Sequence, residues 1–77
     1  MMVPVSRLKM GVSRPQAWID KHPEHTEYQK FLLENIPKEG LHKALEIDRK
    51  FVVQVGNQRL EALRKLGWKF APCDMKG

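Results

Sequence analysis

The residues best suited to chemistry stand in one short run, Gly-Asn-Gln-Arg, at positions 56–59. The run follows an apolar and β-branched segment, residues 51–55, which predicts a strand, and it precedes leucines at helical spacing. A chain that turns from a strand through glycine into a helix leaves the first helical N–H groups without intrahelical partners, and such groups attract anions. Because Arg59 adds a guanidinium to that first turn, the run predicts a phosphate site. The alternative is a common strand-to-helix connection with a solvated arginine.

The two elements that must position this run are the strand over residues 51–55 and the helix that follows it. Leu60, Leu63 and Leu66 fall on one face of that helix together with Ala62. Gly67 is expected to end the helix in the left-handed conformation.

The first half of the chain predicts one strand and two helices. Residues 2–8 alternate in polarity and predict the first strand, and residues 9–13 are expected to form a loop. A short helix capped by Ser13 should carry Pro15 in its first turn. Pro23 is then expected to begin a second, longer helix.

The second helix should end at Pro37 and Gly40, and its apolar stripe should pack on a sheet. Residues 41–47 and 51–55 predict a hairpin, and residues 68–73 predict a final strand at the edge of the sheet. The stripe consists of Tyr28, Phe31, Leu32 and Ile36. The predicted fold is therefore α+β, with a small mixed sheet packed with helices in a single domain over residues 1–77.

The composition favours a polyanionic partner. Fourteen Lys and Arg stand against nine Asp and Glu, a formal charge of +5, although the charges are scattered and also serve solubility. One cysteine, Cys73, excludes an internal disulfide and any Cys-based metal cluster, and it agrees with a reducing cytoplasm. The chain holds no apolar run of membrane-spanning length, so we expect a cytoplasmic protein with no membrane contact.

Four fragments in this order resemble the N-terminal domain of the ParB family, which has the ParB/sulfiredoxin fold and includes domains described as ParB-like nucleases. VPVSRL resembles the opening strand of that family, and SRP lies where the family often carries a proline and an arginine. LLENIPKEGLHKALEID and FVVQVGNQRLEALRKLGWKFAPC resemble its later motifs, and the second of these contains the G-x-x-R turn. The resemblance covers nearly the whole chain. It implies that Gly56 and Arg59 hold a phosphate, such as that of a nucleoside triphosphate with Mg²⁺.

The two positions between Gly56 and Arg59 depart from the patterns of the relatives. Sulfiredoxins carry a cysteine and a histidine there, whereas this chain has Asn57 and Gln58, and a carboxamide is not a nucleophile. Reduction of sulfinic acids is therefore not expected. Partitioning ParB proteins usually carry Glu and Arg there, so nucleotide hydrolysis of that type is not expected either, while binding is. Their helix-turn-helix has no counterpart in these residues, and any contact with nucleic acid should be nonspecific.

Three further residues are candidates for phosphate contact: His42, Lys43 and Arg14. The first two precede the hairpin strand near the predicted turn, and either could donate a charge-assisted hydrogen bond. For all three the alternative is a solvated surface residue.

No metal site is predicted from the sequence. The acids lack the spacing of a divalent-metal cluster, and His22 and His25 flank a proline at a helix start, where capping explains them. The aromatic residues could stack bases, but their spacing favours core positions.

The sequence thus predicts a ParB-like domain that binds the phosphate of a nucleotide or nucleic acid. Two alternatives stay open. One is a ParB-like, metal-dependent nuclease. The other is a small regulator of phage or plasmid type that uses the fold as a scaffold for a homodimer or a protein partner. Catalysis is left undecided, and no catalytic residue is assigned.

Overall fold

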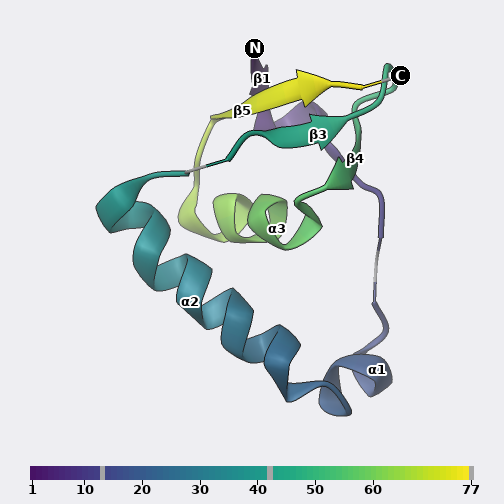
Figure 1. Cartoon of the computed structure of the whole chain (residues 1–77), viewed down its shortest axis with the longest axis vertical. Helices are drawn as coiled ribbons and strands as arrows, with labels where there is room; N and C mark the ends of the chain where they lie inside the picture. The colour runs from purple at the N-terminus through teal and green to yellow at the C-terminus, as the bar shows by residue number, and fades with distance from the viewer. Residues whose placement is uncertain (13, 42, 77) are drawn as a thin grey trace.

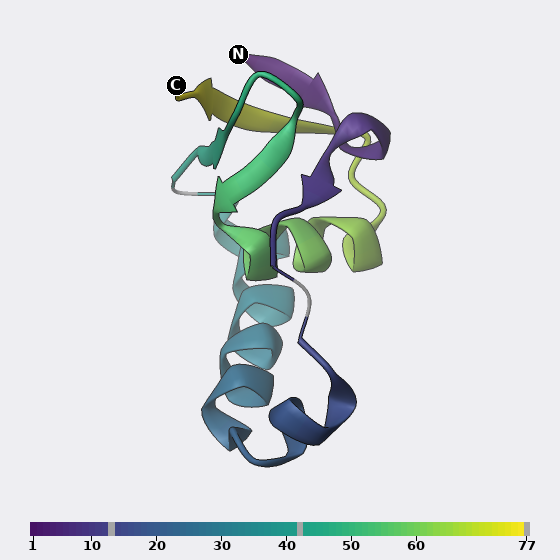
Figure 2. The same ribbon diagram turned by 90° about the vertical axis from the view of Figure 1, so that its right-hand side faces the viewer.

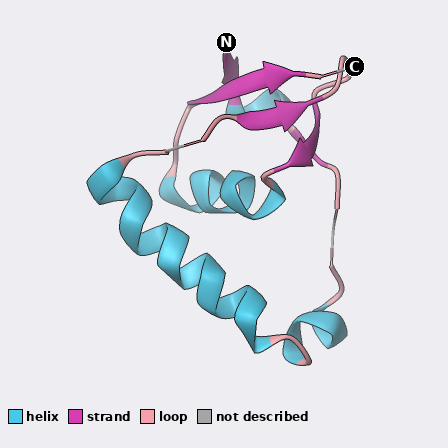
Figure 3. Cartoon of the chain, in the orientation of Figure 1, coloured by secondary structure: helices cyan, strands magenta, loops and turns pink. Residues whose placement is uncertain are grey.

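The computed structural model describes residues 1–12, 14–41 and 43–76. In these residues a sheet is combined with three α-helices that lie on one side of it (Figures 1 and 3). In chain order the elements are β1 (Met2–Pro4), the 3-10 helix η1 (Val5–Arg7), β2 (Lys9–Met10), α1 (Gln16–Asp20), α2 (Pro23–Glu39), β3 (Leu45–Ile47), β4 (Val52–Val55), α3 (Asn57–Leu66) and β5 (Phe70–Met75).

The sheet is mixed, with the strand order β1-β5-β3-β4-β2. β1 and β5 are antiparallel, as are β3 and β4, whereas β3 runs parallel to β5 and β2 runs parallel to β4. The predicted hairpin and the α+β class are confirmed. The expectation of an edge position for the last strand was wrong, because β1 pairs along β5 with Met2 opposite Pro72.

The N-terminal strand differs from the prediction. β1 ends at Pro4, the 3-10 turn follows, and β2 begins at Lys9, where a loop was expected. In the turn the N–H of Leu8 donates to the carbonyl of Val5 at 3.1 Å, which redirects the chain. Because the turn divides residues 2–10 into β1 and β2, this one segment supplies the strands at both edges of the sheet. The expected inward set, Val3, Val5 and Leu8, is buried.

The helices form two layers beneath the sheet. α3 packs under the strands and α2 packs against α3, so that α3 lies between α2 and the sheet (Figure 1). The expectation that the stripe of α2 packs on the sheet was therefore wrong. Leu32 and Ile36 are buried, but Tyr28 and Phe31 are 40% and 55% exposed, because α3 covers only part of that stripe.

The termini of α2 and α3 follow the sequence closely. In α1, Pro15 is the N-cap residue, whereas it was expected in the first turn, and the predicted cap Ser13 lies outside the described residues. Pro23 occupies the first turn of α2, as predicted, and the helix continues through Pro37 until Gly40 ends it. Gly67 caps α3 in the left-handed conformation, with φ 76° and ψ 25°, as predicted. No helix among the described residues is both long and apolar enough to cross a membrane.

Candidate functional site

The turn from β4 into α3 has the geometry that the sequence predicts. Gly56 adopts φ 103° and ψ 26°, a left-handed conformation that suits glycine. A Cβ atom there would lie 2.6 Å from Cδ2 of the buried Leu45, so any larger residue would also force this side chain to move. The N–H of Leu60 donates to the carbonyl of Gly56 at 2.9 Å, and the amides of residues 57–59 precede this bond. These are the amides that a helix leaves without intrahelical acceptors, and the first turn of α3 carries no acidic residue.

A cleft of about 480 Å³ opens at this turn. It lies where the first turn of α3 faces α1, the start of α2 and the segment that follows β2; Figure 2 shows that segment descending past the start of α3. Its lining consists of Met10, Val12, Arg14, Trp18, Ile19, His25, Tyr28, Gly56, Asn57, Gln58, Arg59 and Glu61. The volume is within the range of small-molecule sites.

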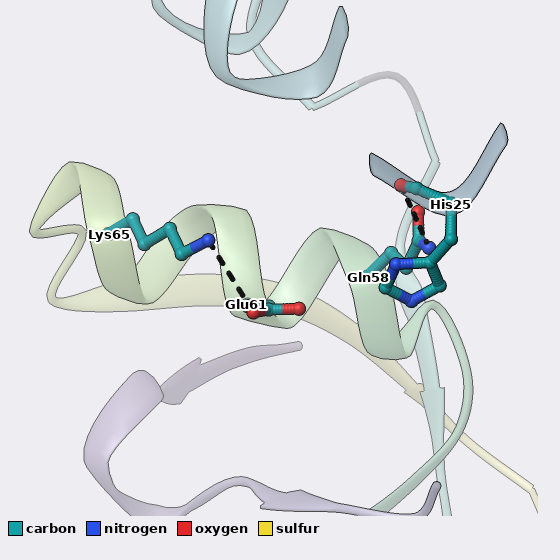
Figure 4. Close-up of polar contacts among 4 residues, drawn as sticks. All are labelled: His25, Gln58, Glu61 and Lys65. Atoms are coloured by element: carbon teal, nitrogen blue, oxygen red, sulfur yellow. Dashed lines mark hydrogen bonds and ion pairs between the residues drawn. The ribbon is translucent and has the colours of Figure 1, made fainter. Parts of the chain in front are cut away.

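Two arginines from distant parts of the chain reach this cleft. Arg59 is half-buried and forms no hydrogen bond or ion pair with another described residue. Arg14 is exposed, and its guanidinium carbon lies 4.5 Å from the ring centroid of Trp18, which is a cation–π contact. Glu61 also lines the cleft, but its carboxylate pairs with Lys65 at 3.5 Å (Figure 4). Both cleft arginines can therefore meet an anion.

Asn57 contributes its backbone to the turn, while its side chain is bonded within the chain. Its Oδ1 accepts the N–H of Gly11 at 2.7 Å and that of Val12 at 3.4 Å. Its Nδ2 donates to the carbonyl of Val53 at 3.2 Å. A ligand at the turn could therefore bind the backbone N–H of Asn57, but not its side-chain carboxamide, which is already hydrogen-bonded.

Gln58 is turned toward the start of α2. Its Nε2 donates to the carbonyl of His25 at 3.5 Å, a long bond, and Figure 4 shows the two side chains together. Its Oε1 is buried and has no hydrogen-bond partner among the described residues. The buried Gln29 supports the same turn, because in the favourable orientation its carboxamide donates to the carbonyl of Gln58 and accepts the N–H of Ala62, each at 3.2 Å.

The structure brings five of the seven predicted residues to one cleft, namely the run 56–59 and Arg14. Lys43 is exposed and does not line this cleft. His42 lies outside the described residues.

The sequence interpretation missed the aromatic wall of the cleft. Trp18 stacks on His22 with ring centroids 3.8 Å apart and meets the edge of His25 at 5.6 Å. Of the three residues Arg14, Trp18 and His22, only Trp18 lies in a helix, α1, while Arg14 precedes it and His22 follows it. No local sequence signal therefore indicates the stack.

Two other chemistries receive no support from the described residues. No group of three or more His, Cys, Asp or Glu gathers there in a metal-binding arrangement. Cys73 is fully buried, as expected, and burial raises the pKa of its thiol. A thiol of that kind is a poor nucleophile.

A mixed five-stranded sheet with its helices on one face, and with a glycine turn from strand into helix, defines the ParB/sulfiredoxin fold, and comparison with solved structures supports this assignment. A Pnob8-like ParB-N domain matches 97% of this chain with a TM-score of 0.69 and 20% sequence identity. Sulfiredoxin from Arabidopsis thaliana matches 99% of this chain with a TM-score of 0.71, also at 20% identity. The chain spans 28% of the length of the ParB-N structure and 84% of the sulfiredoxin. No protein-family model matches the sequence, and no curated protein is significantly similar to it.

Proposed function

We propose that the cleft at the start of α3 binds a phosphate group of a nucleotide or nucleic acid. The observation that carries the proposal is the convergence of Arg14 and Arg59 on a helix start whose first amides have no intrahelical acceptors. Amides at a helix start and guanidinium groups are the two donor types that proteins use most often for phosphate. The resemblance of the 56–59 run to the G-x-x-R turn of ParB proteins supports the same ligand class.

The proposal is for binding without sulfinic acid reduction. That chemistry needs a thiolate beside the bound phosphate, whereas the residue after Gly56 is Asn57, and both ends of its carboxamide are bonded within the chain. A nucleoside triphosphate that carries Mg²⁺ on its own phosphates is the ligand that the resemblance implies. The amides of residues 57–59 and the two arginines would then meet its phosphate oxygens.

The test is a titration of CTP, ATP and a short single-stranded DNA against the wild type and Arg59→Ala. Loss of a charge-assisted hydrogen bond should weaken binding of the preferred ligand about tenfold. Arg49→Ala is the matched control, because Arg49 is exposed in the β3–β4 turn and does not line the cleft. Equal affinity of Arg59→Ala and the wild type for every ligand would remove the proposal.

The nuclease and the protein-interaction regulator stay predictions. No arrangement of the described residues favours either of them over phosphate binding. An assay for DNA cleavage with Mg²⁺ or Mn²⁺, and a measurement of self-association by sedimentation, would test them directly.

A further inference from the structure

Three segments meet at the side chain of Asn57. They are the residues after β2, strand β4 at Val53 and the start of α3. The bonds from Asn57 to Gly11 and Val12 span 46 and 45 residues of sequence. Gly11 lies so close to β4 that a Cβ atom there would stand 2.0 Å from the carbonyl oxygen of Val53. The backbone at residues 11–12 therefore packs directly against β4, and the side-chain carboxamide of Asn57 holds it there by hydrogen bonds.

The two hydrogen-bonding roles of Asn57 explain why a carboxamide suits this position. Its Oδ1 must accept, because it faces the amides of Gly11 and Val12, and its Nδ2 must donate, because it faces the carbonyl of Val53. An aspartate could fill only the accepting role, and it would also place a negative charge in the first turn of α3, beside the proposed phosphate. An alanine could fill neither role.

We propose that Asn57 is a positioning residue, which fastens residues 11–12 to the start of α3 and thereby keeps Arg14 at the same cleft as Arg59. Arg14 follows this segment closely in the chain, and its guanidinium lies on Trp18 in the wall of the cleft. Two arginines 45 residues apart in sequence can act on one anion only if these segments are held together. The part of the inference that concerns anion affinity depends on the phosphate proposal; the part that concerns the segment does not.

The first test needs no ligand. The chain has two tryptophans, so Trp68→Phe leaves Trp18 as a reporter on the cleft wall. In that background, Asn57→Ala should shift the emission of Trp18 and raise its quenching by acrylamide, while far-UV circular dichroism stays that of the parent. Asn35→Ala is the matched control, because Asn35 also donates its Nδ2 to the carbonyl four residues earlier, at 2.8 Å, but on α2 and outside the cleft lining. It should leave the emission of Trp18 unchanged.

The second test measures affinity for tripolyphosphate and for CTP. Asn57→Ala should weaken binding roughly tenfold, at the lower end of the roughly 10- to 100-fold losses seen when a residue that orients a binding group is removed. Asn57→Asp should weaken it further through charge, and Asn35→Ala should bind as the parent does.

The outcomes separate the two proposals. If the parent binds neither anion, the phosphate proposal fails, and the emission of Trp18 still decides the role of Asn57. Emission and quenching of Trp18 in Asn57→Ala identical to those of the parent would overturn the inference. Should Asn57→Ala fail to fold, amide exchange in the unaltered chain decides instead. The N–H of Gly11 should then exchange slowly, and exchange at the rate of an unstructured peptide would refute its bond to Asn57.

Discussion

Gly56 shows how strongly a single backbone position can constrain this molecule. Its φ of 103° belongs to the left-handed region, and the space beside its Cα is filled by Leu45. Gly56→Ala should therefore lower the free energy of unfolding by about 2–4 kcal/mol, as the sum of a left-handed backbone cost and an overpacking cost. Urea denaturation followed by circular dichroism measures the change.

Gly67 provides the matched control for that substitution. It is also left-handed, with φ 76°, but a Cβ atom there would meet nothing within 4 Å. Gly67→Ala should cost only the backbone term, about 1–2 kcal/mol. Equal losses for the two variants would mean that contact with Leu45 does not determine the choice of glycine at position 56.

Gln58 carries a buried oxygen whose hydrogen-bonding capacity is not used within the described residues. Because an unsatisfied buried acceptor costs about 1–3 kcal/mol and the bond from its Nε2 is long, Gln58→Met should keep or raise the free energy of unfolding. Thermal unfolding followed by circular dichroism tests this. A clear loss of stability would show that the contact with His25 matters more than the orphaned oxygen.

The candidate site could be predicted from sequence only where the signal is local. Gly56 and Arg59 follow from residue type and spacing within one turn, and Arg14 followed from the resemblance. The role of Asn57 could not be predicted, because the amides that it binds are 45 and 46 residues away. Lys43 was chosen for its charge near a predicted turn, but the path of the chain places it outside the cleft.

Among the elements, the turn between β3 and β4 is organised by one carboxylate. Oδ1 of Asp48 accepts the amides of Lys50 and Val52, at 2.8 and 3.0 Å, and its Oδ2 accepts Nε2 of Gln54 at 3.2 Å. These bonds hold Phe51 at a φ of 63°, which is rare for a bulky residue. The hydrogen bond from the amide of Val52 is the main cause that lowers the pKa of Asp48 below its ordinary value of 3.8.

This lowered pKa predicts a pH-dependent contribution to stability. Because the folded pKa lies below the unfolded one, the ionised Asp48 stabilises the fold above the unfolded value, and the contribution is lost as the pH falls through the folded value. Asp48→Asn should melt at a lower temperature than the wild type at pH 7, and the difference should shrink as the pH is lowered from 5 to below 3. Asp74→Asn, on β5, is the control. A difference that is independent of pH would show that charge on Asp48 plays no part.

The two long helices could be predicted from sequence, whereas η1 and β2 could not. α2 and α3 have their own caps and periodicity, so local chemistry defines them. η1 and β2 have three and two residues, and β2 exists only because Lys9 and Met10 pair with Val52 and Val53. A two-residue strand has no periodicity of its own and depends on its partner.

At the scale of the whole molecule, the layered arrangement places the first turn of α3 where the three other walls of the cleft meet. α3 has the sheet on one side and α2 on the other (Figure 1). Leu60 and Leu63 are buried and do not line the cleft, so the N-terminal turn is fixed by core side chains that a ligand would not contact. A rigid support of this kind is what a preorganised binding site needs.

The formal charge of +5 on the whole chain raises the question of whether a polyanion would bind at the cleft or over the general surface. If two cleft arginines make the phosphate contacts, the logarithm of the affinity for single-stranded DNA should fall with the logarithm of salt concentration with a slope of about −1.4. Contacts spread over the surface would give a much steeper slope. Fluorescence anisotropy at several NaCl concentrations measures it.

The double variants separate these two modes of binding. Arg14→Ala with Arg59→Ala removes both cleft cations, and it should bring the slope close to zero. Arg49→Ala with Lys50→Ala removes the same charge from the exposed β3–β4 turn and should leave the slope unchanged. Equal slopes for the two double variants would show that DNA binding depends on net charge alone. Each variant removes two positive charges, so the slopes can differ only if the phosphate contacts are localised at the cleft.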